Sequence, residues 1–252
     1  KAQKAATLLS AIPWELLHDE DAYLMQGKTA IGIKRRLPNR RKLDVSTAEL
    51  PIRILLVSAR PEDEVAGYID HRASAKPLIT AVENLGSELV QLTVCAPATF
   101  PDMIDAIKVA EEKGEPFDVI HFDGHGIYDE RTGLGALCFE DPADVDKIVK
   151  RKSKLVDAEE IGKALNEYRI PLMFLEACQT AKTEEEPTAS VAATLLEKGI
   201  TSVVAMTHSV LVTTAAKFVE TFYGKLATGA RVGKAVLDAQ LVLASDRYRL
   251  TI

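Results

Sequence analysis

The chain has 252 residues and a net charge of −6, from 31 basic and 37 acidic side chains, and 47% of its residues are hydrophobic. A chain of this length can bury the core of one large α/β domain. The acidic balance gives no overall attraction to nucleic acid or to an anionic membrane, and no apolar run is long enough to span a bilayer. The composition is that of an ordinary soluble globular protein.

The three cysteines, Cys95, Cys138 and Cys178, lie far apart and form no CxxC pair. This spacing argues against a disulfide framework and against a structural zinc site, so a reducing cytoplasm is the simplest compartment. The chain begins with Lys1 and not with methionine. We therefore expect it to be a piece of a longer protein.

Residues 1–50 differ in pattern from the rest of the chain. Ala2–Ile12 has a short helical pattern, and Tyr23–Gln26 and Thr29–Arg35 flank Gly27 as a predicted hairpin. We expect a single domain over residues 1–252, with residues 1–50 as an N-terminal helix and hairpin extension.

From residue 52 onward, short β-rich runs alternate with longer helical patterns. The short runs are continuously apolar, which is typical of strands buried on both faces of a mostly parallel sheet. The predicted strands are Ile52–Ser58, Leu89–Cys95, Phe117–Phe122, Leu172–Glu176 and Thr201–Met206. The predicted helices span residues 75–86, 101–113, 157–168, 188–198, 211–227 and 230–243. The repeated βα units predict an α/β three-layer sandwich with helices on both faces of the sheet.

Two helix boundaries have recognisable signals. Asp157 followed by Glu160 is typical of a helix start, and Gly199 directly after Lys198 is typical of a helix end. The interval 127–156 is irregular. Residues 133–140 predict a small hairpin, which is followed by a charged loop to Lys154.

Three candidate sites are better explained as ordinary structure. Gly27-Lys28-Thr29 lacks the glycine that a phosphate loop needs, because that position is Ala22. His121 and His125 are four residues apart, but they lie on a strand and have no third local metal ligand, so His121 is predicted to be a hydrogen-bonded core residue. A basic cluster is predicted to be a solvated loop and not a nucleic-acid site; it contains Lys34, Arg35, Arg36, Arg40, Arg41 and Lys42.

His125 follows a buried strand and lies between Gly124 and Gly126. Functional groups of an open parallel sheet collect beyond the carboxyl ends of its strands, and glycines there permit unusual backbone angles and expose N–H groups. The alternative is that the glycines serve only a tight turn and the imidazole points to solvent. The local sequence favours neither interpretation.

Cys178 follows a second buried strand in the same way. If the two strands are neighbours, His125 and Cys178 meet at one edge of the sheet. A Cys–His pair is the minimum machinery for thiol acyl transfer, and the N–H groups of Gly126 and Cys178 are placed to stabilise the oxyanion. Cys95 and Cys138 have no partner histidine after a strand and are predicted to be packing residues.

The motifs HFDGHG and FLEACQT, on successive strands, resemble the caspase-like cysteine peptidases of the caspase–gingipain–separase clan. They are most similar to the CHAT domain, a caspase-type module that is usually joined to TPR repeats or other sensor domains. IPWELLHDEDAYL, IKRRLP, LVDAEEIGKAL and FYGKLATGARVGKAVLDAQ resemble other segments of that family, so the similarity covers roughly residues 11 to 245.

The resemblance implies a caspase-like fold and hydrolysis of peptide bonds in a protein substrate, with His125 and Cys178 as the catalytic dyad. It implies no metal and no organic cofactor, a sensor or TPR-type regulatory partner, and a natural setting in bacterial defence. Two features depart from the family pattern. Residues 206–218 lack the tryptophan and the acidic residue common in relatives, and the interval 127–156 is long and charged.

The substrate preference stays open. In this clan the loop after the first strand contributes to the primary pocket; Arg60 there would favour an acidic residue before the cut, whereas Glu62 or Asp63 would favour a basic one. Asp123 and Glu176 alternate towards the same edge of the sheet, where they either line the cleft or are solvated at the surface. Two other functions are alternatives to a peptidase. One is a catalytically silent CHAT-like scaffold. The other is a flavodoxin-like nucleotide or phosphate binder, against which the absence of a glycine-rich loop after the first strand argues.

Overall fold

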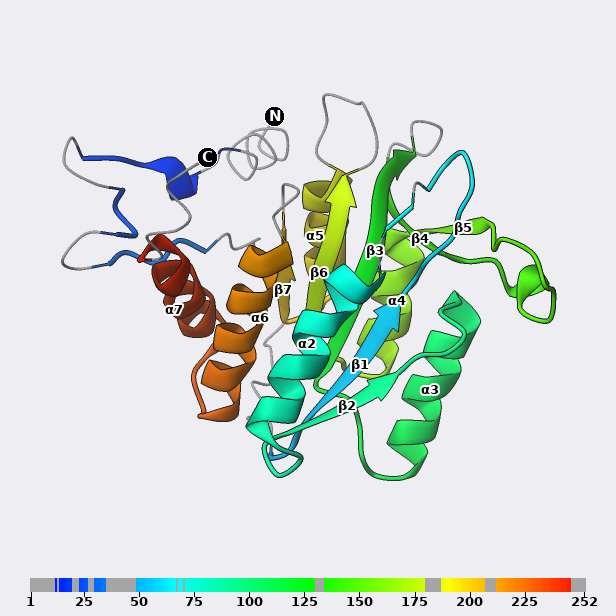
Figure 1. The fold of residues 1–252 in the computed structure, drawn as a ribbon, viewed down its shortest axis with the longest axis horizontal. Helices are drawn as coiled ribbons and strands as arrows, with labels where there is room; N and C mark the ends of the chain where they lie inside the picture. Colours follow the sequence, from blue (N-terminus) through cyan, green and yellow to red (C-terminus); the bar gives the residue numbers. More distant parts are fainter. Residues whose placement is uncertain are drawn as a thin grey trace.

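The computed structural model describes residues 12, 14–19, 23–26, 30–34, 49–66, 68–69, 71–129, 134–179, 187–206 and 212–245. Within these ranges the chain forms one seven-stranded sheet with helices on both faces (Figure 1). The predicted α/β three-layer architecture is therefore confirmed. The helix predicted at residues 2–12 and the basic cluster lie almost entirely outside the described residues, as does Gly27.

The sheet is parallel except at one end. β1 (Ile52–Ser58) pairs in parallel with β2 (Val90–Val94) and β3 (Val119–Asp129), and β3 pairs in parallel with β6 (Leu172–Gln179), which pairs with β7 (Ser202–Ala205). The two remaining strands are antiparallel: β4 (Leu134–Glu140) pairs with β3, and β5 (Ser153–Asp157) pairs with β4.

The helices form a layer on each face of the sheet (Figure 1). The front layer contains α2 (His71–Leu85), α6 (Val212–Ala227) and α7 (Val232–Ala244), which pack on residues such as Ile54 and Phe174. The back layer contains α3 (Phe100–Glu112), α4 (Ala158–Glu167) and α5 (Pro187–Glu197), which pack on residues such as Leu55 and Phe122. Neighbouring residues of a strand thus enter opposite cores, which is the reason for the continuously apolar runs.

Both predicted helix boundaries are confirmed. The Asp157 carboxylate accepts a hydrogen bond of 2.8 Å from the Glu160 backbone N–H and so caps the first turn of α4. Gly199, two residues after the last residue of α5, has φ of 108°, a left-handed conformation that favours glycine.

The predicted end of β3 at Phe122 is wrong, because the strand continues through both glycines to Asp129. One edge of β3 is paired with β6 as far as Gly126. Its other edge is paired with β1 as far as Asp123 and with β4 from His125 onward. Since partners are available on both sides, the backbone stays extended where local glycine propensity predicts a turn. β6 likewise continues past its predicted end, to Gln179.

The interval around β4 and β5 also differs from prediction. Residues 134–140 form the single strand β4 instead of a hairpin, and the predicted charged loop contains a 3₁₀ helix, Pro142–Asp144, followed by β5. Near the N-terminus, Tyr23 forms an isolated bridge with His18 and residues 24–26 form a turn, where a strand was predicted. A short 3₁₀ helix, Trp14–Leu16, precedes them.

Gly124 is needed for space and not for an unusual backbone angle. A Cβ built there would lie 2.9 Å from Cε1 of Phe122 and 3.3 Å from the carbonyl oxygen of Ala59. The Phe122 ring is fully buried and cannot yield freely.

We therefore expect Gly124→Ala to lower the free energy of unfolding by about 1–3 kcal/mol, as other overpacked core sites do. Urea denaturation followed by circular dichroism measures this change. Gly233→Ala is the matched control, because nothing lies within 4 Å of the Cβ built at Gly233. Equal stability of the two variants would contradict the tight contact at Gly124.

Candidate active site

β3 and β6 bring His125 and Cys178 side by side. In the parallel register of these two strands, Asp123 is partnered by Glu176 and His125 by Cys178. Paired positions on neighbouring strands share one face of the sheet. The predicted adjacency of the two strands is thus confirmed, although both residues lie within the strands and not beyond their ends.

The His125 side chain lies in the interior of the protein. It is 1% exposed, so the alternative of an imidazole pointing to solvent is excluded. Alternation along β3 places His121, Asp123 and His125 on the front face, which α2, α6 and α7 cover. In this arrangement the His125 imidazole is almost inaccessible to solvent.

A second cysteine also lies in register with His125. Cys138 on β4 is partnered by His125 on the side opposite to β6. Cys138 is fully buried, as predicted for a packing residue. The expectation that it has no partner histidine is wrong, because the sequence did not place β4 beside β3. The Cys138 thiol is fully buried, and burial, with a smaller effect of the Asp63 charge, raises its pKa to about 12. At neutral pH this thiol is protonated and so is a poor nucleophile.

Cys95 has the buried environment predicted for a packing residue. It is 6% exposed, its thiol donates to the Pro97 carbonyl oxygen at 3.3 Å, and burial raises its pKa to about 12. Of the three thiols, the sequence and the register leave Cys178 as the candidate nucleophile.

Asp123 is two residues before His125 on the same face of β3, and its carboxylate contacts residues at the end of β1 and just after it. It is 2% exposed, forms an ion pair with the Arg60 guanidinium and accepts a hydrogen bond of 3.1 Å from the Ser58 hydroxyl. The same guanidinium donates to the carbonyl oxygens of Ala59 and Asp123, at 2.8 Å and 2.7 Å. Two of the predicted substrate-binding residues, Arg60 and Asp123, are thus brought together as a neutral pair.

Glu176, the partner of Asp123 in register, belongs to a buried hydrogen-bonded chain. His121 Nε2 lies 3.1 Å from a Glu176 carboxylate oxygen, and His121 Nδ1 lies 2.9 Å from the Tyr223 hydroxyl. His121 also stacks on Phe174, with 4.6 Å between ring centroids. The prediction that His121 is a hydrogen-bonded core residue is confirmed. Glu176 is 7% exposed and Asp123 is 2% exposed. Both carboxylates are therefore buried, which excludes the alternative that they are solvated at the surface.

Asp63 holds the loop after β1 against the start of β5. Its carboxylate accepts hydrogen bonds from the Ser153 hydroxyl and backbone N–H, both at 2.7 Å, and from the N–H groups of Val65 and Ala66. Burial acts to raise the pKa of Asp63, but these hydrogen bonds outweigh it and lower the pKa to about 2. The carboxylate is engaged within the loop, and a contact with substrate stays a prediction.

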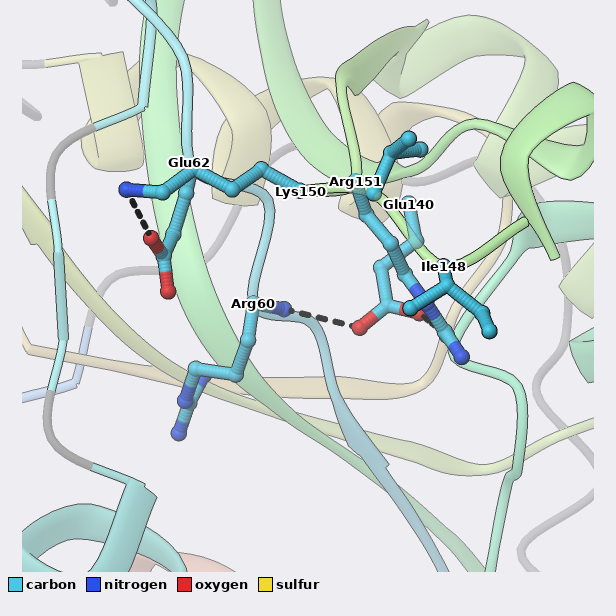
Figure 2. Close-up of a pocket in the computed structure, with 7 residues that line it drawn as sticks. Arg60, Glu62, Glu140, Ile148, Lys150 and Arg151 are labelled. Atoms are coloured by element: carbon cyan, nitrogen blue, oxygen red, sulfur yellow. Dashed lines mark hydrogen bonds and ion pairs between the residues drawn. The ribbon is translucent and has the colours of Figure 1, made fainter.

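A pocket of about 520 Å³ lies between this loop and the β4–β5 connection. Figure 2 shows the Lys150–Glu62 ion pair on one side and the bond from the Arg60 backbone N–H to Glu140 on the other. Arg151 also pairs with Glu140. The Arg60 side chain extends away from Glu140 (Figure 2). The lining of the pocket contains these charged pairs and does not include Cys138 or Cys178, the residues in register with His125.

Gly126 lies inside the doubly paired part of β3, in register with Gln179 on one side and Leu137 on the other. Its N–H therefore points along the sheet towards one of these strands. Stabilisation of an oxyanion by the N–H groups of Gly126 and Cys178 stays a prediction.

Sequence reasoning did not find Ser58, Cys138 and Tyr223. Their contacts join segments far apart in the chain, and no local pattern marks them. Within the described ranges, no group of three or more His, Cys, Asp or Glu side chains could hold a metal ion. None of the helices described there is long and apolar enough to cross a membrane.

Comparisons with known proteins give one family match. The family model described as "CHAT domain" matches residues 5–250. Among solved structures, the crystal structure of the Drosophila initiator caspase Dronc is similar at a TM-score of 0.42 and 10% sequence identity, and the match covers 77% of this chain and 73% of that chain. No curated protein sequence matches the chain.

Proposed function

This chain belongs to the CHAT domain family, and we propose that it is a caspase-like cysteine endopeptidase that hydrolyses peptide bonds in a protein substrate. Family membership supports a cysteine peptidase in general. The observation that carries the proposal for this chain is the parallel register of β3 and β6, in which His125 is partnered by Cys178. A nucleophile and its base on neighbouring strands are the minimum arrangement for acyl transfer through a thiol.

In the proposed reaction, His125 takes the proton of the Cys178 thiol and the thiolate attacks the carbonyl carbon of the scissile peptide bond. The backbone N–H groups of Gly126 and Cys178 stabilise the oxyanion. Protonated His125 then donates its proton to the leaving amine, which leaves an acyl-enzyme. Water hydrolyses this thioester with His125 as the base, and the free thiol returns.

We propose that Arg60, Asp63, Asp123 and Glu176 lie along the substrate cleft. Because Arg60 and Asp123 form an ion pair, together they bring no net charge to it. This pairing weakens the simplest argument for a preference for acidic residues. The preference between acidic and basic residues before the cut is therefore left to the cleavage experiment below.

We further propose that the peptidase is switched on by an attached sensor or TPR-type regulatory domain or subunit. Burial of His125, at 1% exposure, supports a resting state that substrate does not enter. We propose that the protein acts in the cytoplasm, in bacterial defence. We also propose that this domain binds neither nucleic acid nor membrane directly.

The test uses the full-length protein with its activating partner. Parent and Cys178→Ala proteins are each incubated with a proteome, and new peptide termini are identified by mass spectrometry. We expect termini with a common sequence preference from the parent and none above background from Cys178→Ala, because alanine has no nucleophile.

Equal cleavage by both proteins with the activator bound would contradict the peptidase. The alternative would then be a catalytically silent scaffold. Burial of His125 also fits this alternative, because a buried imidazole is not accessible to a substrate.

A further inference from the structure

β2 forms one lateral edge of the sheet. Its five residues, with the sequence VQLTV, pair in parallel with β1 from Val90 to Val94. Within the described ranges no strand pairs with its other side, and Figure 1 shows β2 at the margin of the sheet between α2 and α3. Such an edge presents a row of backbone N–H and C=O groups to which another strand can bind.

The hydrogen bonds to β1 show which backbone groups of β2 face outwards. The Leu89 carbonyl oxygen and the Cys95 N–H each bond to β1, at 2.9 Å and 2.8 Å. Because alternate residues of a strand direct their backbone groups to the same side, Val90, Leu92 and Val94 face away from β1. In the part of the chain that the structure describes, the N–H groups of Leu92 and Val94 have no hydrogen-bond partner.

The side chains of β2 do not prevent pairing at this edge. The strand contains no charged residue and no proline, the two features that most often block an edge. Gln91 and Thr93 are exposed on the α3 side of the sheet. On the α2 side, Leu92 is partly buried and Val94 is 52% exposed. A further strand here would cover Val94 and supply partners for the outward backbone groups.

We propose that β2 is the interface of a symmetric dimer, in which it pairs antiparallel with β2 of a second copy of this chain. The strand reads almost the same in both directions, VQLTV and VTLQV. With Leu92 opposite Leu92 of the second copy, Val90 lies opposite Val94, and Gln91 lies opposite Thr93. Apolar side chains thus meet on one face of the sheet and polar side chains on the other.

The backbone of β2 fits the same register. In an antiparallel pair, residues that face the partner exchange both of their hydrogen bonds with the residue opposite, and Leu92, at the centre, faces outwards. The Leu92 residues of the two copies bond to each other, and each Val94 N–H donates to the Val90 carbonyl oxygen of the other copy. A slip of two residues in either direction would leave two of the five residues in each strand without a partner.

The symmetry of the strand favours a second copy as the occupant of this edge. A strand from a different protein would pair with β2 whether or not the sequence read the same in both directions. No charge on β2 selects a partner of opposite charge. The inference does not depend on the proposed peptidase, and its test needs neither a substrate nor an activator.

Disulfide cross-linking of the full-length protein tests the register. Gln91→Cys and Thr93→Cys are co-expressed, purified together and oxidised, and cross-linked peptides are identified by mass spectrometry. Opposite residues in this kind of pair have Cα atoms about 4.5 Å apart, within the range of a disulfide, whereas two copies of position 91 are about 7–8 Å apart. We expect a disulfide between positions 91 and 93 in the mixture, and about tenfold less cross-linked dimer from either variant alone or from the parent.

Charged substitutions test whether this edge sustains the dimer. Gln91→Lys/Thr93→Lys places lysine opposite lysine twice, at positions that are exposed in each copy. We expect the association constant, measured by sedimentation velocity from about 1 to 100 µM, to fall about tenfold. Mixing this variant with Gln91→Glu/Thr93→Glu should restore association. The matched control, Thr80→Lys/Thr213→Lys, adds the same charge at exposed positions of α2 and α6 and should change the constant by less than about threefold.

A parent protein that stays monomeric over this concentration range would overturn the inference. A 91–93 disulfide no more abundant in the mixture than the cross-links of the single variants would also overturn it, whether the edge is free, pairs in another register or binds a strand from elsewhere. If the full-length protein dimerises through another segment, Gln91→Lys/Thr93→Lys leaves its association unchanged, which has the same consequence. If the lysine variant does not fold, the cross-link alone decides.

Discussion

His125→Ala is expected to lower the rate of peptide-bond cleavage by about 10²- to 10⁴-fold, the usual loss when a positioned general base is removed. Alanine leaves the Cys178 thiol in place but removes the group that takes its proton and later protonates the leaving amine. Steady-state cleavage of a peptide that contains the mapped site, with the activating partner present, measures the change. We expect the loss mainly in kcat, since no binding contact is assigned to the imidazole.

The matched control for His125→Ala is Cys138→Ala. Cys138 flanks His125 in the register on the β4 side, as Cys178 does on the β6 side. Its buried thiol, with a pKa raised to about 12, carries a thiolate fraction of only about 10⁻⁵ at pH 7. Cys138→Ala should therefore keep activity within a few-fold of the parent. A loss in Cys138→Ala as large as in Cys178→Ala would make Cys138 the nucleophile.

Phe174→Ala is expected to cost about 3–5 kcal/mol in the free energy of unfolding, as removal of a buried aromatic ring does elsewhere. Phe174 is fully buried in the front core. Its ring lies 5.4 Å from the centroid of Phe222, 6.1 Å from that of Tyr223 and 4.6 Å from that of His121. Removal leaves a cavity between β6 and α6 that the stiff sheet cannot close. Urea denaturation with an unchanged m-value would establish the loss of stability.

Two other variants calibrate the Phe174 prediction. Phe174→Leu keeps most of the apolar volume and should cost less than Phe174→Ala. Ile148→Ala changes an apolar side chain that is fully exposed, and we expect an effect within about 0.5 kcal/mol. If Phe174→Ala were as stable as Ile148→Ala, the aromatic packing against α6 would not contribute to stability as the structure indicates.

The order of the buried strands and their helices could be predicted from the sequence because the signals are local. Continuous apolar runs mark strands with a core on each side, and β1 begins and ends where its run does. Asp157 and Gly199 mark helix ends through contacts made within a few residues. The prediction failed for β3 beyond Phe122 and for β5, where partners far along the chain supply the hydrogen bonds and outweigh local propensity.

For the candidate site, the sequence by itself determined the residue types and the strands that carry them. His125 and Cys178 follow apolar runs that two neighbouring strands would bring to one edge. Only the tertiary structure decided the register, because register depends on pairing between segments more than fifty residues apart. It also placed Cys138 beside His125, paired Arg60 with Asp123, and joined Glu176 to Tyr223 through His121. Charge balance in a buried site depends on such distant partners, and no local pattern in the sequence records them.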